Sequence, residues 1–285
     1  MLTPALVDDV VGAALREDAP WGDVTSEYLI PADATAVATL SAREPGVFAG
    51  RAAFEAAFRL TDARITVEWR LAEGARFAAG DELARVSGPA RGILTGERIA
   101  LNFSQRMSGI ATLTSEYVAL IAGTNAVIAD TRKTTPGLRA FERHAVTCGG
   151  GHNHRFSLSD AVMAKDNHLA VLTAGGKDLT VELARVRAEL PHTMKLEVEV
   201  DRLDQIEPVV AAGVDIVMLD NFSISDLKTG VAFIAGRSLV EASGGVNRET
   251  VRQIAETGVD VISVGALTHS ARALDLGLDV VIDAR

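Results

Sequence analysis

Four segments decide the fold of this chain: L-E-V-E-V-D (196–201), I-V-M-L-D-N (216–221), L-V-E-A-S-G-G (239–245) and V-I-S-V-G-A-L (261–267). Each is short and apolar, as strands are, and they recur about every 20 residues. Helical patterns lie between them at 203–212, 224–235 and 248–257, and a glycine follows each, where helices commonly end. With a further strand-like V-I-A-D at 127–130, this alternation predicts serial β-α units and a parallel sheet.

Polar or glycine residues stand at the carboxyl end of each predicted strand. They are Lys133, Glu199, Asp201, Asp220, the triplet Ser243, Gly244 and Gly245, and Gly265. In α/β barrels this edge carries the active site, and phosphate often binds at the loops after the last two strands. The sequence therefore predicts a barrel-like domain and the edge on which its site lies.

The first part of the chain has a different pattern. Thr3 before Pro4 reads as an N-cap, so a first helix is expected there. From 36 to 87, short β-like runs broken by tight turns predict a small sheet. Helical spacing returns at 91–122, with a break expected at Ser108-Gly109. We place the domain boundary between 112 and 113, giving domains 1–112 and 113–285, and expect the extreme C-terminus to pack back on the N-terminal domain.

Composition narrows the class of protein. The chain has 285 residues, 48% of them apolar and 23% charged, which are ordinary globular values. There is no basic segment followed by an apolar leader and no run near the ~18 apolar residues of a membrane span, so we expect a cytoplasmic protein. A single cysteine, Cys148, excludes an internal disulfide and reads as a small core residue. The net charge of −10 argues against general affinity for nucleic acid or anionic membranes.

One window is cationic within this acidic chain. Between residues 130 and 168 there are six Lys or Arg against four acids, and four of the six histidines. Only five of the 28 basic residues are lysine, and none precedes residue 133. Because arginine serves elsewhere as the generic cation, Lys133 and Lys165 are inferred to need an ammonium group; chance placement is the alternative.

The cationic window suits a polyanionic ligand. Its Lys and Arg residues are 132, 133, 139, 143, 155 and 165, and Arg takes carboxylates or phosphates in bidentate fashion. The triplet at 149–151 either lets the backbone approach a ligand or forms a flexible turn. His152 and His154 lack a nearby carboxylate at ligand spacing, so zinc is not favoured, and His154 is expected to donate a hydrogen bond beside Arg155.

Two further groups complete the predicted edge. Glu199 and Asp220 end successive strands and either hold Mg²⁺, which prefers carboxylates with phosphate oxygens and water, or form salt bridges with the lysines. Whether the carboxylates touch the metal directly or through water stays open. The triplets 243–245 (Ser243, Gly244, Gly245) and 264–266 (Val264, Gly265, Ala266) offer free backbone N–H groups where helices are expected to begin, which suits a phosphate.

These segments resemble the quinolinate phosphoribosyltransferase family. The resemblance rests on E-R-I-A-L-N-F-S-Q-R-M-S-G-I-A-T (97–112), D-T-R-K-T-T-P-G-L-R (130–139), C-G-G-G-H-N-H-R-F-S-L-S-D (148–160), K-D-N-H (165–168), A-S-G-G-V (242–246) and V-G-A-L-T-H-S (264–270). It covers nearly the whole chain. It implies a small N-terminal α/β sandwich domain, an open or incomplete C-terminal α/β barrel, and a homodimer with composite active sites.

The resemblance also implies roles for single residues. Arg132, His154, Arg155 and Lys165 would bind the two carboxylates of quinolinate, with Arg98 arriving from the neighbouring subunit. Lys133, beside Thr131, would lie between the substrates and act in catalysis. Glu199 and Asp220 would serve the ribose hydroxyls and Mg²⁺, while a phosphate group would be held by Ser243, Gly244, Gly245, Val264, Gly265, Ala266 and His269. The reaction would join phosphoribosyl pyrophosphate to quinolinate with loss of CO2, giving nicotinate mononucleotide and pyrophosphate.

Other interpretations remain at this point. The molybdenum-transport-associated branch is similar along much of the chain, but N-H-R (153–155) and K-D-N-H (165–168) retain the carboxylate-binding set. A Schiff-base lyase or aldolase would use a strand-end lysine, which borohydride trapping of Lys133 or Lys165 would detect. A lipoyl or biotinyl carrier needs a lysine, and residues 66–88 contain none. Taken alone, Arg98 is read as an intrahelical or surface ion-pair residue, and only the resemblance assigns it to the partner's pocket.

Overall fold

The computed structural model describes residues 2–283, and these fold as two compact units. The first unit contains residues 2–115, 134–150 and 268–283, and the second contains residues 116–133 and 151–267. The predicted boundary at 112/113 lies close to the first crossing between units. The chain then returns to the first unit twice, at 134–150 and at 268–283. The prediction of two continuous domains had placed 134–150 in the C-terminal domain. The reason is local packing of that segment, described below.

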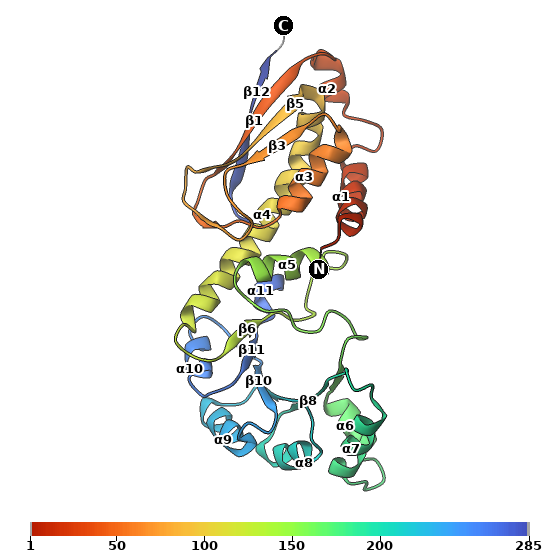
Figure 1. Ribbon diagram of the computed structural model, residues 1–285, viewed down its shortest axis with the longest axis vertical. Coiled ribbons are helices and arrows are strands. Elements are labelled where there is room, and N and C mark those ends of the chain that lie inside the picture. The colour runs from red at the N-terminus through yellow and green to blue at the C-terminus, as the bar shows by residue number, and fades with distance from the viewer. Residues whose placement is uncertain (1, 284–285) are drawn as a thin grey trace. The chain divides into compact units, whose positions relative to one another are not determined.

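The sheet of the first unit has four strands in the order β12-β1-β5-β3 (Figure 1). These are β12 (Leu276–Asp283), β1 (Thr35–Ala42), β5 (Glu82–Pro89) and β3 (Thr66–Trp69). The pairs are antiparallel, with Leu40 of β1 opposite Leu278 of β12. A separate two-stranded ribbon joins β2 (Gly46–Val47) to β4 (Arg76–Phe77). The C-terminal strand thus belongs to the same sheet as the N-terminal strands.

Helices of the first unit confirm one expectation and correct another. Helix α1 (Pro4–Asp18) begins as predicted, because the Thr3 side chain accepts a hydrogen bond from the Leu6 N–H. Helix α2 (Val24–Leu29) follows. The prediction of only β-like runs at 36–87 is wrong for α3 (Arg51–Thr61). Phe54 and Phe58, one helical turn apart, are fully buried on one face of α3, and this spacing was the signal that was missed.

Helix α4 (Ala90–Leu120) runs unbroken through Ser108-Gly109, so the predicted break is wrong. Glycine stands at 109 because a Cβ there would lie 1.8 Å from the carbonyl oxygen of Arg272. The Ser108 hydroxyl bonds to the backbone of Ala49, donating to its oxygen and accepting from its N–H. Both residues therefore serve close packing and not a helix end.

Helix α5 (Arg139–Cys148) explains why residues 134–150 belong to the first unit. Gly149, directly after α5, approaches α4 so closely that a Cβ would lie 2.3 Å from the Ala111 carbonyl oxygen. The first glycine of the 149–151 triplet is thus required by helix packing. Neither reading offered from the sequence, close approach to a ligand or a flexible turn, accounts for Gly149.

The second unit contains a six-stranded parallel sheet in the order β6-β11-β10-β9-β8-β7 (Figure 1). The strands are β6 (Val127–Ala129), β11 (Val261–Ser263), β10 (Leu239–Ser243), β9 (Ile216–Asp220), β8 (Leu196–Val200) and β7 (Val162–Ala164). Five of them lie in the predicted strand segments, and β7 was not predicted. Within residues 2–283, β6 and β7 are the two edges of the sheet, so its wall is open.

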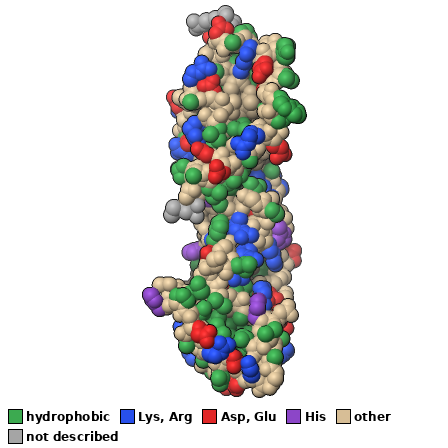
Figure 2. Space-filling model, turned by 90° about the vertical axis from the view of Figure 1, so that its right-hand side faces the viewer, with side chains coloured by type: hydrophobic (Ala, Val, Ile, Leu, Met, Phe, Trp, Pro, Cys, Tyr) green, Lys and Arg blue, Asp and Glu red, His purple; other side chains and the backbone are tan. Residues whose placement is uncertain are grey.

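Helices connect these strands, and one more, α11, follows the last of them, β11. They are α6 (Asp166–Leu172), α7 (Leu179–Glu189), η1 (Leu203–Gln205), α8 (Ile206–Ala211), α9 (Ile224–Ile234), α10 (Val251–Ala255) and α11 (Ala266–His269). The helix predicted at 203–212 divides into η1 and α8, and α10 is shorter than its predicted range. Among residues 2–283, no helix is both long and apolar enough to cross a bilayer. Basic and acidic side chains are interspersed over the face drawn in Figure 2, so no single-sign region dominates that face.

Candidate active site

A cavity of about 530 Å³ lies at the carboxyl ends of the parallel strands in the second unit. Most of the residues proposed from the sequence line it, namely Thr131, Arg132, Lys133, His154, Arg155, Lys165, Glu199, Asp220, Ser243, Gly244 and Gly245. Parallel strands bring their carboxyl ends to one edge, so residues far apart in sequence converge there. The cavity is lined by cations and carboxylates together.

Two of the cationic side chains, Arg155 and Lys165, bond to other groups of the protein in this structure. The Arg155 guanidinium donates to the Ala161 carbonyl oxygen at 3.1 Å and contacts the Met163 sulfur at 3.4 Å. Burial, and then the charge of Arg132, lower the pKa of Arg155. Lys165 Nζ lies 2.5 Å from Glu199 Oε2, which is the salt bridge considered as one reading of Glu199. An anionic ligand would relieve the repulsion between Arg132 and Arg155.

His154, which directly precedes Arg155, belongs to a buried cluster of one histidine and two glutamates. His154 Nε2 is 3.3 Å from both Glu197 Oε2 and Glu241 Oε2, and the three side chains are 12%, 1% and 3% exposed. The Ser263 hydroxyl donates to the other oxygen of Glu241. Two carboxylates therefore lie beside His154, although none stands near it at ligand spacing in the sequence. Glu197 lies on β8 and Glu241 on β10, whereas His154 lies in the segment between β6 and β7, so spacing in the sequence did not reveal them.

Two observations bear on the protonation of His154. Burial alone would lower the pKa of His154, but the hydrogen bonds and charges of Glu197 and Glu241 outweigh it and raise the pKa to about 10. Burial, together with the Glu241 charge, raises the pKa of Glu197. However, His154 Nδ1 accepts a 2.7 Å hydrogen bond from the Arg155 N–H, which a protonated Nδ1 cannot do. Nε2 carries a proton between the two carboxylates, and the second proton that the raised pKa implies would take the place of the hydrogen bond from Arg155 at Nδ1.

Asp220 and the glycine turn form the opposite wall. Asp220 accepts a hydrogen bond from the Asn221 side chain at 2.6 Å. Asn221 has a left-handed backbone, with φ of 58°, and its N–H donates to the Ser243 carbonyl oxygen. A Cβ on Gly244 would lie 2.2 Å from Asn221 Oδ1, so only glycine fits there. Asn221 lines the cavity and was not proposed from the sequence, although it directly follows Asp220.

The remaining proposed residues are not among those lining the cavity. Val264 donates its N–H to the Ala129 carbonyl oxygen at 2.9 Å, so the expectation of a free N–H there is wrong. Gly245 does not begin a helix, because α10 starts only at Val251. Gly265 and Ala266 lie next to Val264 but do not line the cavity. Arg98 and His269 belong to the first unit, and their roles stay predictions.

An apolar cavity of about 710 Å³ adjoins this site and shares Arg132, Arg155, Met163 and Lys165 with it. Its walls come from β7, β8, α6 and α7, and include Val171, Leu172, Leu183, Val186 and Leu196. An apolar wall beside several cations suits a flat ring that carries negative charges.

The fold and the cavity are typical of an α/β enzyme that acts on small molecules. The chain belongs to the quinolinate phosphoribosyltransferase family. The family's N-terminal domain matches residues 23–108, and its C-terminal domain matches residues 110–279.

Individual relatives agree over nearly the whole chain. The nicotinate-nucleotide pyrophosphorylase [carboxylating] of Mycobacterium leprae is 41% identical over 281 residues, covering 95% of this chain and 96% of that protein. The quinolinate phosphoribosyltransferase [decarboxylating] 2b, mitochondrial, of Nicotiana tabacum is 41% identical, covering 95% of this chain and 81% of that protein. The crystal structure of NadC from Streptococcus pyogenes superposes with a TM-score of 0.94 at 41% identity, covering 100% of this chain and 99% of that one.

Proposed function

We propose that this chain transfers the phosphoribosyl group of phosphoribosyl pyrophosphate to quinolinate and releases CO2 and pyrophosphate, giving nicotinate mononucleotide for NAD biosynthesis. The observation that carries this proposal is the match of both family domains together with the cation-lined cavity of the second unit. The chain is accordingly a pentosyltransferase.

The cations of the cavity suit the two carboxylates of quinolinate. Arg132, Arg155 and Lys165 line both adjoining cavities, so a dicarboxylate ring placed there would meet them on one side and the apolar wall on the other. A ligand carboxylate that bonds to Lys165 would compete with Glu199, which holds Lys165 in this structure. Release of Glu199 on substrate binding would then make its carboxylate available to the second substrate.

The chemistry follows from where charge develops. The ring nitrogen of quinolinate attacks the ribose C1, and the bond from C1 to pyrophosphate breaks with its electron pair leaving on the pyrophosphate. The nitrogen becomes cationic, so the adjacent 2-carboxylate can leave as CO2, its bonding electrons staying on the ring carbon until a proton arrives. Side chains that are already oriented around these charges supply the main catalytic effect. We assign this role to Lys133, Glu199 and Asp220.

We also propose that the site uses Mg²⁺. Glu199 and Asp220 would hold it, because two carboxylates at one strand edge, together with phosphate oxygens and water, fit the preference of Mg²⁺ for oxygen ligands. When bound, the ion would neutralise charge on the departing pyrophosphate. Asp220→Asn should raise the Mg²⁺ concentration for half-maximal rate, and an unchanged Mg²⁺ dependence would remove Asp220 from the metal site.

The direct test is incubation with quinolinate, phosphoribosyl pyrophosphate and Mg²⁺, with CO2 and nicotinate mononucleotide measured together. We expect equal amounts of both products. Nicotinate lacks the 2-carboxylate and should be a poor substrate, since it would leave cations of the cavity unpaired. Comparable turnover of nicotinate would contradict the proposed carboxylate pocket.

We infer that the chain acts as a homodimer with composite sites. A cluster of exposed apolar side chains on the first unit supports this, with Trp21 91% and Tyr28 87% exposed and Val24 and Leu29 close in sequence. Arg98 would act in the partner's site. Arg98→Ala and Lys133→Ala homodimers should both be nearly inactive, and subunit exchange between them should restore about a quarter of wild-type sites by symmetry counting. No recovery after demonstrated exchange would place Arg98 in the cis site.

We further propose a cytoplasmic location, in keeping with the single cysteine of the chain. Fractionation of the source cells, with detection by antibody, should recover the protein with cytoplasmic markers. Recovery with an organelle or an exported fraction would contradict this.

A further inference from the structure

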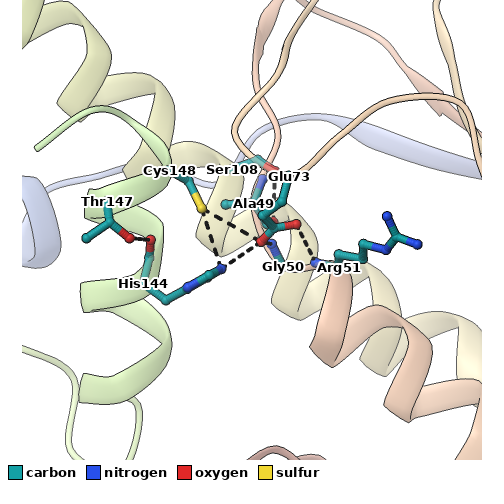
Figure 3. A network of polar contacts seen from close by, with 8 residues as sticks. All are labelled: Ala49, Gly50, Arg51, Glu73, Ser108, His144, Thr147 and Cys148. Atoms are coloured by element: carbon teal, nitrogen blue, oxygen red, sulfur yellow. Dashed lines mark hydrogen bonds and ion pairs between the residues drawn. The ribbon is translucent and has the colours of Figure 1, made fainter. Parts of the chain in front are cut away.

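The first unit contains a cluster of three side chains of different chemistry, which Figure 3 shows pointing toward one another. His144 and Cys148 come from α5, and Glu73 comes from the turn between β3 and β4. Glu73 Oε1 is 2.9 Å from His144 Nε2 and 3.7 Å from Cys148 Sγ, and Sγ is 3.5 Å from Nε2. One oxygen, one nitrogen and one sulfur thus form a small triangle.

The dimensions of this triangle fit one face of a zinc tetrahedron. Zinc bonds of about 2.3 Å to sulfur, 2.05 Å to nitrogen and 2.1 Å to oxygen, at the tetrahedral angle, place the ligand atoms ~3.6 Å (S to N), ~3.6 Å (S to O) and ~3.4 Å (N to O) apart. The two sulfur distances observed agree to about 0.1 Å with these values. The Nε2 to Oε1 distance is shorter because these atoms share a hydrogen bond, and it needs to open by only about 0.5 Å.

The protein also orients the ligand atoms. His144 and Cys148 are one helical turn apart, so both side chains project from one face of α5. The Gly50 N–H donates to Glu73 Oε1 at 2.8 Å and the Arg51 N–H donates to Oε2 at 3.1 Å (Figure 3). Hydrogen bonds of this kind fix the direction of metal-ligating carboxylates. A carboxylate oxygen that accepts one such bond keeps a second lone pair for a metal.

We propose that Glu73, His144 and Cys148 bind one zinc-class divalent cation. Thiolate and imidazole select borderline-soft cations such as Zn²⁺, whereas Mg²⁺ requires oxygen ligands, so this set does not serve the Mg²⁺ chemistry proposed for the second unit. The side chains of His144 and Glu73 are 33% and 24% exposed, so solvent can reach the site and supply a fourth ligand.

Such a cation would tie α5 to the turn between β3 and β4 and to the start of α3. Residues 134–150, which include α5, stand in the sequence between Lys133 and the segment holding His154 and Arg155. The bound cation would therefore fix the fold of a segment whose two flanks both line the candidate active site. We infer a structural role, measured as stability, and not a step in the reaction.

Cobalt(II) is the probe for this proposal, because a thiolate ligand gives it an intense near-ultraviolet charge-transfer band and Cys148 is the sole cysteine of the chain. The tag-free, reduced, full-length chain would be stripped with a chelator and titrated with Co²⁺. We expect the band to saturate at one equivalent, to disappear on addition of Zn²⁺, and to persist in millimolar Mg²⁺. Zn²⁺ should also raise the melting temperature of the stripped protein.

Variants separate this site from adventitious binding. Cys148→Ser, which is nearly isosteric, should abolish the band, and both it and His144→Ala should weaken Zn²⁺ binding at least ~10-fold by calorimetry. His192→Ala removes an exposed histidine of the second unit and should change nothing. Circular dichroism would show that each variant is folded, and Cys148→Ala provides a second replacement if the serine variant is not. Absence of the band in the wild-type chain, or unchanged Zn²⁺ affinity in the cysteine variants, would overturn the proposal.

Discussion

The two units each place a histidine against glutamate, and the two clusters differ in burial and in composition. In the second unit, His154 lies between Glu197 and Glu241, and both carboxylates are almost fully buried. In the first unit, His144 pairs with a single glutamate, Glu73, and both are partly exposed. The buried His154 therefore faces two carboxylates, whereas the partly exposed His144 faces one.

The difference in burial affects the charge state of each cluster. Two buried carboxylates require a proton or cation between them, because burial of unpaired charge is costly. The cluster of His154 therefore has its charge state set from within the fold, and His154 itself lines the cavity. In the other cluster, burial and the nearby Glu73 charge raise the pKa of the Cys148 thiol to about 12. Cys148 is therefore a poor nucleophile, and a cation bound there would have to displace the thiol proton.

The largest expected effect is on stability. His154→Ala should lower the free energy of unfolding by about 3–5 kcal/mol, because it leaves two facing carboxylates without their shared partner. The matched change His144→Ala removes a partly exposed pair and should cost at most about 1 kcal/mol in the absence of metal. Urea unfolding followed by circular dichroism compares the two variants. Equal losses would show that burial does not distinguish the clusters.

The next effect is on activity. Arg155→Ala should raise the KM for quinolinate and lower kcat/KM at least ~10-fold, since a charge-assisted pair contributes on the order of 1.5–3 kcal/mol. Arg155→Lys should restore only part of this loss, because an ammonium cannot reproduce the guanidinium fork. Arg185→Ala, which removes surface pairs with Glu182 and Glu189, is the control and should stay near wild type. Wild-type kinetics for Arg155→Ala would make Arg155 a structural residue.

The last comparison is the pH dependence of stability, which depends on the same His154. The folded-state pKa of His154, about 10, lies above its usual value of about 6.5. Its contribution to stability is therefore complete below about pH 6.5 and is lost as pH rises through about 10. Glu241→Gln should flatten this decline in urea unfolding measured across the range. A His154 ring found neutral at pH 7 by NMR would instead show that the Nδ1 bond from Arg155 prevails.

Some of the candidate site could be read from the sequence because its signals are local. Glu199 and Asp220 follow runs of strand-forming residues, and the carboxyl ends of parallel strands meet at one edge. Lys133 and Lys165 stood out by composition alone. The resemblance to the quinolinate phosphoribosyltransferase family, carried by motifs along nearly the whole chain, is confirmed by the match to both family domains.

Other features depended on which face each element buries. Glu197 and Glu199 alternate with apolar residues on β8 and so share a face, but periodicity does not say that this face also meets His154 and Glu241. The helix break predicted at Ser108-Gly109 is wrong because glycine is needed at 109 for a different reason. The carbonyl oxygen of Arg272, distant in sequence, leaves no room for a Cβ there.

The sequence by itself determined the parallel α/β class, the cationic window and the family, because strand and helix periods and motif residues act over short stretches of chain. The tertiary structure alone decided the two histidine clusters. His144 and Cys148 are visible as a pair one helical turn apart, yet Glu73 lies 71 residues from His144. Such a partner is fixed by packing of whole elements, which spacing along the chain does not encode.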